Sequence, residues 1–121
     1  MAQTLSKSER LSGKTAVGGL MKKGRWGSTC HLKYCWLFHE SGENVRIMVS
    51  VPKRLFKRAV KRNLLKRRLR ESYRTQKDIL PEGLYADILF LYNSKETLDS
   101  GTLFAEVGDI LRSIAGKNSE S

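Results

Sequence analysis

The chain has 121 residues, of which 40% are hydrophobic, and it carries a formal net charge of +11. This length suits one domain with a single core, and the hydrophobic share excludes global disorder. No apolar run approaches the roughly 20 residues that span a bilayer, and the N-terminus lacks the apolar centre of a secretory signal. We therefore expect one cytoplasmic domain over residues 1–121 with no membrane partner, and polar tails at 1–9 and 116–121.

A short helix is predicted over Lys14–Lys23, where Val17, Leu20 and Met21 recur at helical spacing. The double glycine inside it costs roughly 1 kcal/mol per residue relative to alanine, so this helix needs tertiary support. Gly24 is well placed to end it.

Two strands are predicted next, over Cys30–Phe38, which is rich in aromatic residues, and Val45–Val51, which alternates. The short turn-like loop between them is typical of an antiparallel hairpin. A break at Arg25–Ser28 allows another short strand before them. Within the first strand we expect Tyr34, Trp36 and Phe38 to pack in the core, although aromatic rings could also stack on bases. The opposite face is then exposed and forms the edge of a candidate groove; its residues are Lys33, Cys35 and Leu37.

The same region holds residue types that bind zinc, namely Cys30, His31, Cys35 and His39. Their spacing matches no standard zinc finger, and the two cysteines fall on opposite faces of an extended strand. We therefore expect no metal site here, and no structural disulfide in a reducing compartment.

The second half of the chain outside its basic segment supplies one more strand and a final helix. Pro52 ends the preceding strand, Tyr85–Tyr92 has the continuous apolar character of a buried central strand, and Leu103–Ile114 is an amphipathic helix. The predicted fold is of the α+β class, a two-layer sandwich of a small mixed sheet and helices in the order α-β-β-β-α-β-α.

The segment Lys53–Lys77 contains 12 of the 23 basic residues and one acid, Glu71, so its own formal charge is +11. The remaining 96 residues hold 11 basic and 11 acidic side chains. A domain that concentrates its charge in this way has a surface for a polyanion, most commonly nucleic acid.

From Ala59 onward this segment has two helical faces. Leu65, Leu69 and Tyr73 form an apolar face for packing on the sheet. The opposite face is polar and consists of Asn63, Lys66, Arg67, Arg70 and Arg74. A solvated surface is the alternative explanation, but like charges at i and i+4 destabilise a helix unless an anion relieves them. Arginine also suits bidentate phosphate contacts.

No arrangement of residues typical of catalysis is present: we find no histidine beside a nucleophile, no phosphate-binding glycine loop and no carboxylate cluster for magnesium. Any catalysis must therefore be supplied by a partner.

The segment SVPKRLFKRAVKRNLLKRRLRESYR, Ser50–Arg74, resembles the signature region of the bacterial ribonuclease P protein component. The resemblance extends over nearly the whole chain, from SKSERL near the start to the YADILFLY strand and the closing helix. The family motif is Arg-Asn-Arg followed by a further basic cluster. Arg62 and Asn63 match it and Leu64 replaces the second arginine; the positions beyond are matched by Lys66, Arg67 and Arg70.

This resemblance implies an accessory subunit of a ribozyme. In the family, the RNA subunit uses magnesium to remove the 5′ leader of precursor tRNA by hydrolysis, and the protein binds that RNA through the basic helix without a cofactor or catalytic residue of its own. The expected contacts with the RNA subunit are Arg62, Asn63, Lys66, Arg67, Arg70 and Arg74. The family fold also implies a left-handed β-α-β crossover around this helix, against the general rule.

The resemblance further implies a cleft between the sheet and the first helix, in which the single-stranded leader lies. Val17 and Met21 stand where the family usually has aromatic residues, and Cys35 where tyrosine is common. Base stacking contributes roughly 1–3 kcal/mol per base, so we expect this protein either to hold the leader less tightly or to use other groups. The expected cleft residues are Val17, Met21, Lys33, Cys35, Ser50, Lys53 and Arg54.

Two other functions are compatible with a basic helix. A non-enzymatic RNA-binding or ribosome-associated module would use the same surface on folded RNA. A DNA-binding helix-turn-helix protein needs a short helix before the basic one, and a strand ending at Pro52 takes that place. We therefore expect ribonuclease P RNA and precursor tRNA as partners, and no DNA.

Overall fold

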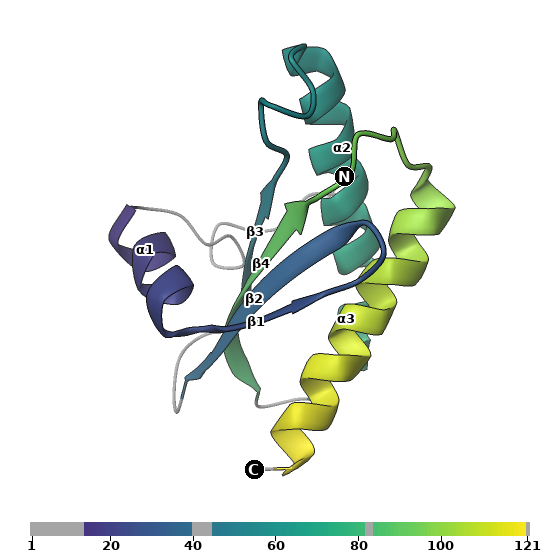
Figure 1. Cartoon of the computed structure of the whole chain (residues 1–121). Helices are drawn as coiled ribbons and strands as arrows, with labels where there is room; N and C mark the ends of the chain where they lie inside the picture. Colours follow the sequence, from purple (N-terminus) through teal and green to yellow (C-terminus); the bar gives the residue numbers. More distant parts are fainter. Residues whose placement is uncertain (1–13, 40–44, 82–83, 121) are drawn as a thin grey trace, which may run out of the picture.

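The computed structural model describes residues 14–39, 45–81 and 84–120. Its elements, in chain order, are α1 (Lys14–Lys23), β1 (Arg25–Ser28), β2 (Leu32–His39), β3 (Arg46–Ser50), α2 (Ala59–Arg74), the short 3-10 helix η2 (Lys77–Ile79), β4 (Tyr85–Tyr92) and α3 (Ser100–Glu120). Figure 1 shows α1 apart from the pair formed by α2 and α3. The predicted α+β class and element order are confirmed. The predicted tail at 1–9 lies outside the described residues, and Gly116 to Glu120, placed in a polar tail above, continue α3.

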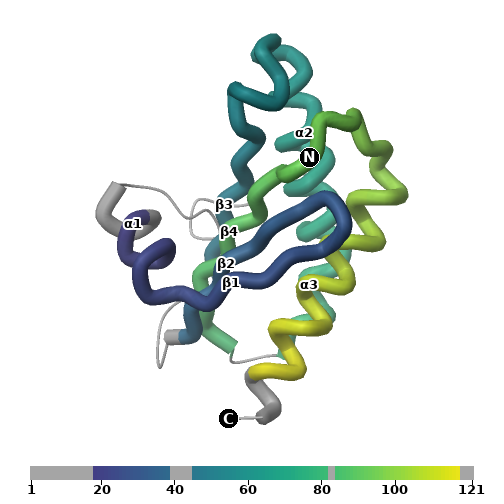
Figure 2. The backbone as a smooth tube through the Cα atoms, viewed as in Figure 1, coloured from purple at the N-terminus to yellow at the C-terminus, as the bar shows by residue number. Residues whose placement is uncertain are grey.

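The four strands form one mixed sheet in the order β1-β2-β4-β3. β4 pairs antiparallel with β2 and parallel with β3, so the predicted hairpin between β2 and β3 is wrong. The physical reason is that β4 is apolar on both faces, which favours an inner position between two partners. Because β3 and β4 are parallel neighbours, α2 connects them in the β-α-β unit that the resemblance implies. The path of the chain through these strands can be followed in Figure 2.

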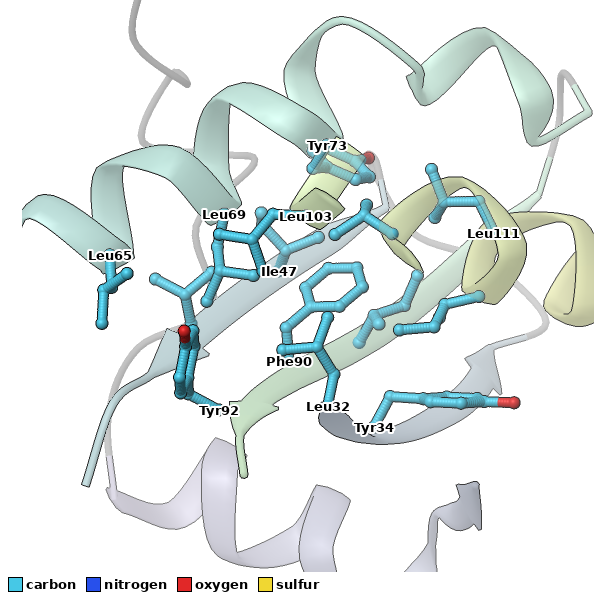
Figure 3. Close-up of a cluster of buried hydrophobic side chains, with 14 of the residues drawn as sticks. Leu32, Tyr34, Ile47, Leu65, Leu69, Tyr73, Phe90, Tyr92, Leu103 and Leu111 are labelled. Atoms are coloured by element: carbon cyan, nitrogen blue, oxygen red, sulfur yellow. The ribbon is translucent and has the colours of Figure 1, made fainter. Parts of the chain in front are cut away.

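The main core lies between one face of the sheet and the helices α2 and α3. Figure 3 shows side chains from both layers meeting around Phe90, which is fully buried. Tyr34 and Trp36 of β2 point into this core and stack on one another, with ring centroids 5.5 Å apart, which confirms the predicted facing of that strand. The other large, fully buried members include Leu65, Leu69, Tyr73, Ile88, Tyr92, Leu103, Ile110 and Leu111.

A smaller cluster lies on the opposite face of the sheet, beneath α1. Leu20 of α1 packs there on Cys35 and Leu89, both buried. The prediction that Cys35 is exposed is therefore wrong, because α1 covers it, and burial raises the pKa of its thiol. Gly24 permits this close approach: a Cβ at that position would lie 2.6 Å from the sulfur of Cys35 and 2.5 Å from the carbonyl oxygen of Leu20.

Candidate nucleic-acid interface

The helix α2 presents its apolar residues to the core and its polar residues to solvent. Leu65 and Leu69 are fully buried, whereas Asn63, Arg67 and Arg70 are exposed. Both predicted faces of this helix are therefore present. Of the other predicted contacts, Lys66, Arg62 and Arg74 are half-buried.

Two polar contacts fix α2 against the elements that follow β4. The guanidinium of Arg68 donates a hydrogen bond to the carbonyl oxygen of Leu98 at 2.7 Å, in the loop before α3. Just beyond the helix, the side-chain amide of Gln76 donates to the carbonyl oxygen of Phe104 in α3 at 2.8 Å. These contacts and the buried leucines hold the outward face of α2 in a fixed orientation.

Two of the predicted RNA contacts also serve the protein itself. One terminal nitrogen of Arg62 donates to the carbonyl oxygens of Phe56 and Lys57, at 2.7 and 2.8 Å, and so secures the chain that leads into α2. The Nε of Arg74 lies 3.1 Å from a carboxylate oxygen of Glu71. This hydrogen bond lowers the pKa of Glu71, so the only acid of the segment is ionised and paired at neutral pH.

The N-terminal end of α2 adds cations that the sequence-based list of contacts left out. Lys57, Arg58 and Lys61 are exposed, and the first turn of the helix contains no acid. The unpaired N–H groups of a helix N-terminus give that end a partial positive charge, which adds to these side chains. The charge run in the sequence was the available signal, but Lys57 and Arg58 precede the helix and Lys61 belongs to neither of the two predicted faces.

The sheet face beneath α1 brings some of the predicted cleft residues together. Lys33 of β2 and Ser50 of β3 are both paired with Leu91 of β4, so the three lie in one row across the sheet. Lys33 is exposed, whereas Ser50 and Leu91 are half-buried. This row forms one end of the sheet face.

The remaining predicted cleft residues are distributed differently. Lys53 and Arg54 are exposed in the turn that follows β3, and Met21 of α1 is 47% exposed. Cys35 is buried beneath α1, and the side chain of Val17 lies outside the described residues.

An acidic residue on this sheet face is neutralised internally. Asp87 of β4 is buried and accepts two hydrogen bonds from Arg46 of the neighbouring β3, with oxygen to nitrogen distances of 2.9 and 3.0 Å. A bidentate pair of this kind satisfies both carboxylate oxygens. The face therefore presents no uncompensated carboxylate at this position to an approaching anion.

The residues considered for zinc do not converge. The Nδ1 of His31 lies 2.6 Å from a carboxylate oxygen of Glu106 in α3, whereas the sulfur of Cys35 is directed at the carbonyl oxygen of Leu20 in α1. Within the described ranges, no three His, Cys, Asp or Glu side chains form a group that could hold a metal ion. None of the helices in this part of the chain is both long and apolar enough to cross a membrane.

Comparison with known proteins gives a consistent result. The family model for ribonuclease P matches residues 5–115. The ribonuclease P protein component of Porphyromonas gingivalis is 35% identical over 122 residues, which cover 93% of this chain and 87% of that protein. That of Thermotoga maritima is 29% identical over 121 residues, covering 96% of this chain and all of the relative.

Solved structures share the fold at lower sequence identity. The RNase P protein of Staphylococcus aureus superposes with a TM-score of 0.77 at 21% identity, covering 89% of this chain and 96% of that one. The RNase P protein of Thermotoga maritima superposes with a TM-score of 0.74 at 23% identity, covering 87% and 96%. With a family model that matches most of its length and relatives that align almost end to end, this chain belongs to the ribonuclease P protein family.

Proposed function

We propose that this protein binds the RNA subunit of ribonuclease P through the outward face of α2 and so assists that RNA in removing the 5′ leader of precursor tRNA. The observation that carries the proposal is the exposed row around Arg67, fixed on a helix whose inner face is fully buried. The proposed contacts with the RNA subunit are Arg62, Asn63, Lys66, Arg67, Arg70 and Arg74.

The contribution of these residues is electrostatic. Folding a long RNA and docking a precursor on it brings phosphates together, and cations on a rigid helix relieve that repulsion by displacing condensed counterions. In this proposal the hydrolytic chemistry belongs to the RNA subunit and its magnesium ions. The protein binds the RNA subunit, helps to position the precursor and neutralises phosphate charge.

The second part of the proposal concerns the leader. The row formed by Lys33, Leu91 and Ser50 offers a cation, an apolar surface and a hydroxyl on one exposed end of the sheet, and it suits a single strand with its phosphates toward the lysine. Lys53, Arg54, Met21 and Val17 complete the proposed cleft. Cys35 does not contact the leader in this proposal, because Leu20 covers it.

A cleavage assay tests the proposal directly. The purified protein is added to ribonuclease P RNA and a precursor tRNA across a magnesium series, and we expect leader removal to occur at lower magnesium when the protein is present. Arg67→Ala should reduce this effect. Arg112→Ala is the matched control, because Arg112 is an exposed arginine of α3 that pairs with Asp109 on the same helix.

Cleavage that is indifferent to the protein would refute the proposal. Recovery of ribosomal RNA, rather than one dedicated RNA, on the purified protein would instead favour a ribosome-associated module.

A further inference from the structure

A second basic surface is present on the side of the molecule that carries α1 and β1. Residues 14–39 include five lysines and arginines and no Asp or Glu. Lys22 and Lys23 are exposed in the last turn of α1, and Lys33 is exposed on β2. This positive surface is separate from the outward face of α2.

An exposed tryptophan lies within this surface. Trp26 of β1 is 45% exposed, although an indole ring has one of the largest apolar surfaces of any side chain. It is paired directly with Cys35, and residues opposite one another in an antiparallel ladder point to the same side. Trp26 therefore lies on the sheet face that carries α1, at its outer edge. Lys33, two residues along β2 from Cys35, is its diagonal neighbour on that face.

We propose that Trp26 is a stacking platform for a base of single-stranded RNA, with Lys22, Lys23 and Lys33 binding the adjacent phosphates. The inference rests on the proposed function and deepens it. Lys33 belongs both to this surface and to the row proposed for the leader, so one strand can follow the sheet from Ser50 toward β1. Trp26 then supplies an aromatic contact that Val17, Met21 and Cys35 do not.

The chemistry of the surface favours an unpaired nucleic acid over the other possible occupants. In a duplex the faces of each base are covered by its neighbours, so stacking on an indole requires an unpaired base. A second copy of this chain would bring a net charge of +11 against another +11, which opposes association through a basic face. A single strand satisfies the ring and the lysines together.

The two tryptophans of the chain allow a direct test, because Trp36 is 6% exposed and packs in the core. In the full-length Trp36→Phe protein, Trp26 is the only tryptophan. We expect saturable quenching of its fluorescence by a single-stranded oligoadenylate of about eight nucleotides, within the usual range of site sizes. A duplex of the same length should quench far less.

Affinity measurements on the otherwise unchanged protein supply the matched comparison. Trp26→Ala should raise Kd for the oligoadenylate by about 5-fold to 150-fold, the equivalent of the roughly 1–3 kcal/mol that stacking contributes per base. Trp26→Phe should raise it less. Phe104→Ala should leave it unchanged, because Phe104 is an aromatic side chain of α3 with a similar exposure of 46%. Thermal unfolding of each variant confirms that it is folded.

Several outcomes would overturn the inference: an unchanged Kd for a folded Trp26→Ala, equal quenching by inorganic polyphosphate, or a fluorescence change that follows protein concentration without RNA. Equal quenching by polyphosphate would mean that the surface binds any polyanion through charge alone. A fluorescence change that follows protein concentration would mean that the surface contacts another copy of the chain. If the wild-type protein still lowers the magnesium requirement for cleavage, only this inference fails. If it does not, the proposed function fails independently.

Discussion

Glu106 of α3 anchors the turn between β1 and β2, and replacing it with glutamine tests how strongly that anchor stabilises the fold. The residue is 8% exposed. One carboxylate oxygen accepts hydrogen bonds from the hydroxyl of Thr29 and from the backbone N–H of His31, the latter at 2.9 Å. The other oxygen lies 2.6 Å from the Nδ1 of His31. Three contacts thus join the first strand pair to the last helix.

The size of the effect follows from these contacts. Glu106→Gln preserves the shape and one carbonyl oxygen but removes the charge and places an NH2 group opposite His31. Hydrogen bonds to a charged group contribute about 1.5–3 kcal/mol, so we expect the free energy of unfolding at neutral pH to fall by about that amount. Against a total of roughly 5–15 kcal/mol for a typical domain, this loss is readily measured by urea unfolding.

The pH dependence of the free energy of unfolding tests whether the charge of Glu106 causes this loss of stability. Burial alone would raise the pKa of Glu106, but hydrogen bonds from Thr29 and His31 outweigh it and hold the pKa below the ordinary value of 4.5. The unfolded chain therefore binds the proton more tightly than the folded one, so this contribution is full above pH 4.5 and is lost as pH falls through the folded pKa. The difference between wild type and Glu106→Gln should accordingly shrink in acid.

The matched control is Glu96→Gln, because Glu96 is exposed and lies 3.8 Å from the Nε2 of the same histidine. It should leave the unfolding curve essentially unchanged. A stability difference for Glu106→Gln that stays constant from neutral pH into acid, or that is absent at neutral pH, would refute the reasoning.

Three further predictions concern α2 and its packing on α3. Arg67→Ala should weaken binding to ribonuclease P RNA and leave the melting curve of the protein unchanged. If one phosphate contact is lost, the slope of log K against log salt concentration should fall in magnitude by about 0.7–0.9. A binding defect that is the same at every salt concentration would contradict this prediction. Leu69→Ala should lower the free energy of unfolding by about 2–5 kcal/mol, measured in urea, and a loss well below 1 kcal/mol would contradict its burial. Gly108→Ala should lower the free energy of unfolding by about 1–3 kcal/mol relative to Gly116→Ala in the same helix, because its Cβ would lie 2.5 Å from the side-chain oxygen of Gln76 and displace the amide that donates hydrogen bonds to Ser72 and Phe104. Gly116 has open space, so equal melting temperatures of the two variants would contradict this prediction.

The two faces of α2 could be predicted from the sequence because its periodicity and charge indicate the same orientation. Leu65 and Leu69 recur every fourth residue, and the burial of such a stripe follows from helix geometry alone. The inward facing of Tyr34 and Trp36 followed from strand alternation in the same way. Local periodicity was therefore sufficient to show which residues of an element share one face.

The neighbours of each strand could not be derived in this way. A short loop after β2 is compatible both with a hairpin and with a strand that pairs elsewhere. The pairing is decided by β4, which begins 46 positions after the end of β2 (85 against 39) and occupies the place beside β2. The burial of Cys35 likewise depends on where α1 lies. The hydrogen bonds of Arg62 depend on its rotamer, which the spacing of residues does not specify.

The second basic surface escaped the sequence analysis for a different reason. Charge outside the basic segment was summed over 96 residues together, and residues 78–121, with eight acidic and three basic side chains, cancelled the excess of five at 14–39. The fold separates these two groups, with α1 and α3 packed on opposite faces of the sheet. A count over shorter windows would have found the excess, but only the structure places Trp26 within it.

The position of β4 between β2 and β3 has a consequence for biosynthesis. A ribosome delivers β1, β2 and β3 first, yet among the described strands β3 has no neighbour other than β4. The sheet cannot be completed until Tyr92 has left the exit tunnel, and the core is not covered until α3 follows. The basic helix is thus synthesised before the surface that orients it exists. Pairing between segments so distant in sequence slows folding, so the nascent chain carries the highly positive segment before its apolar face is covered.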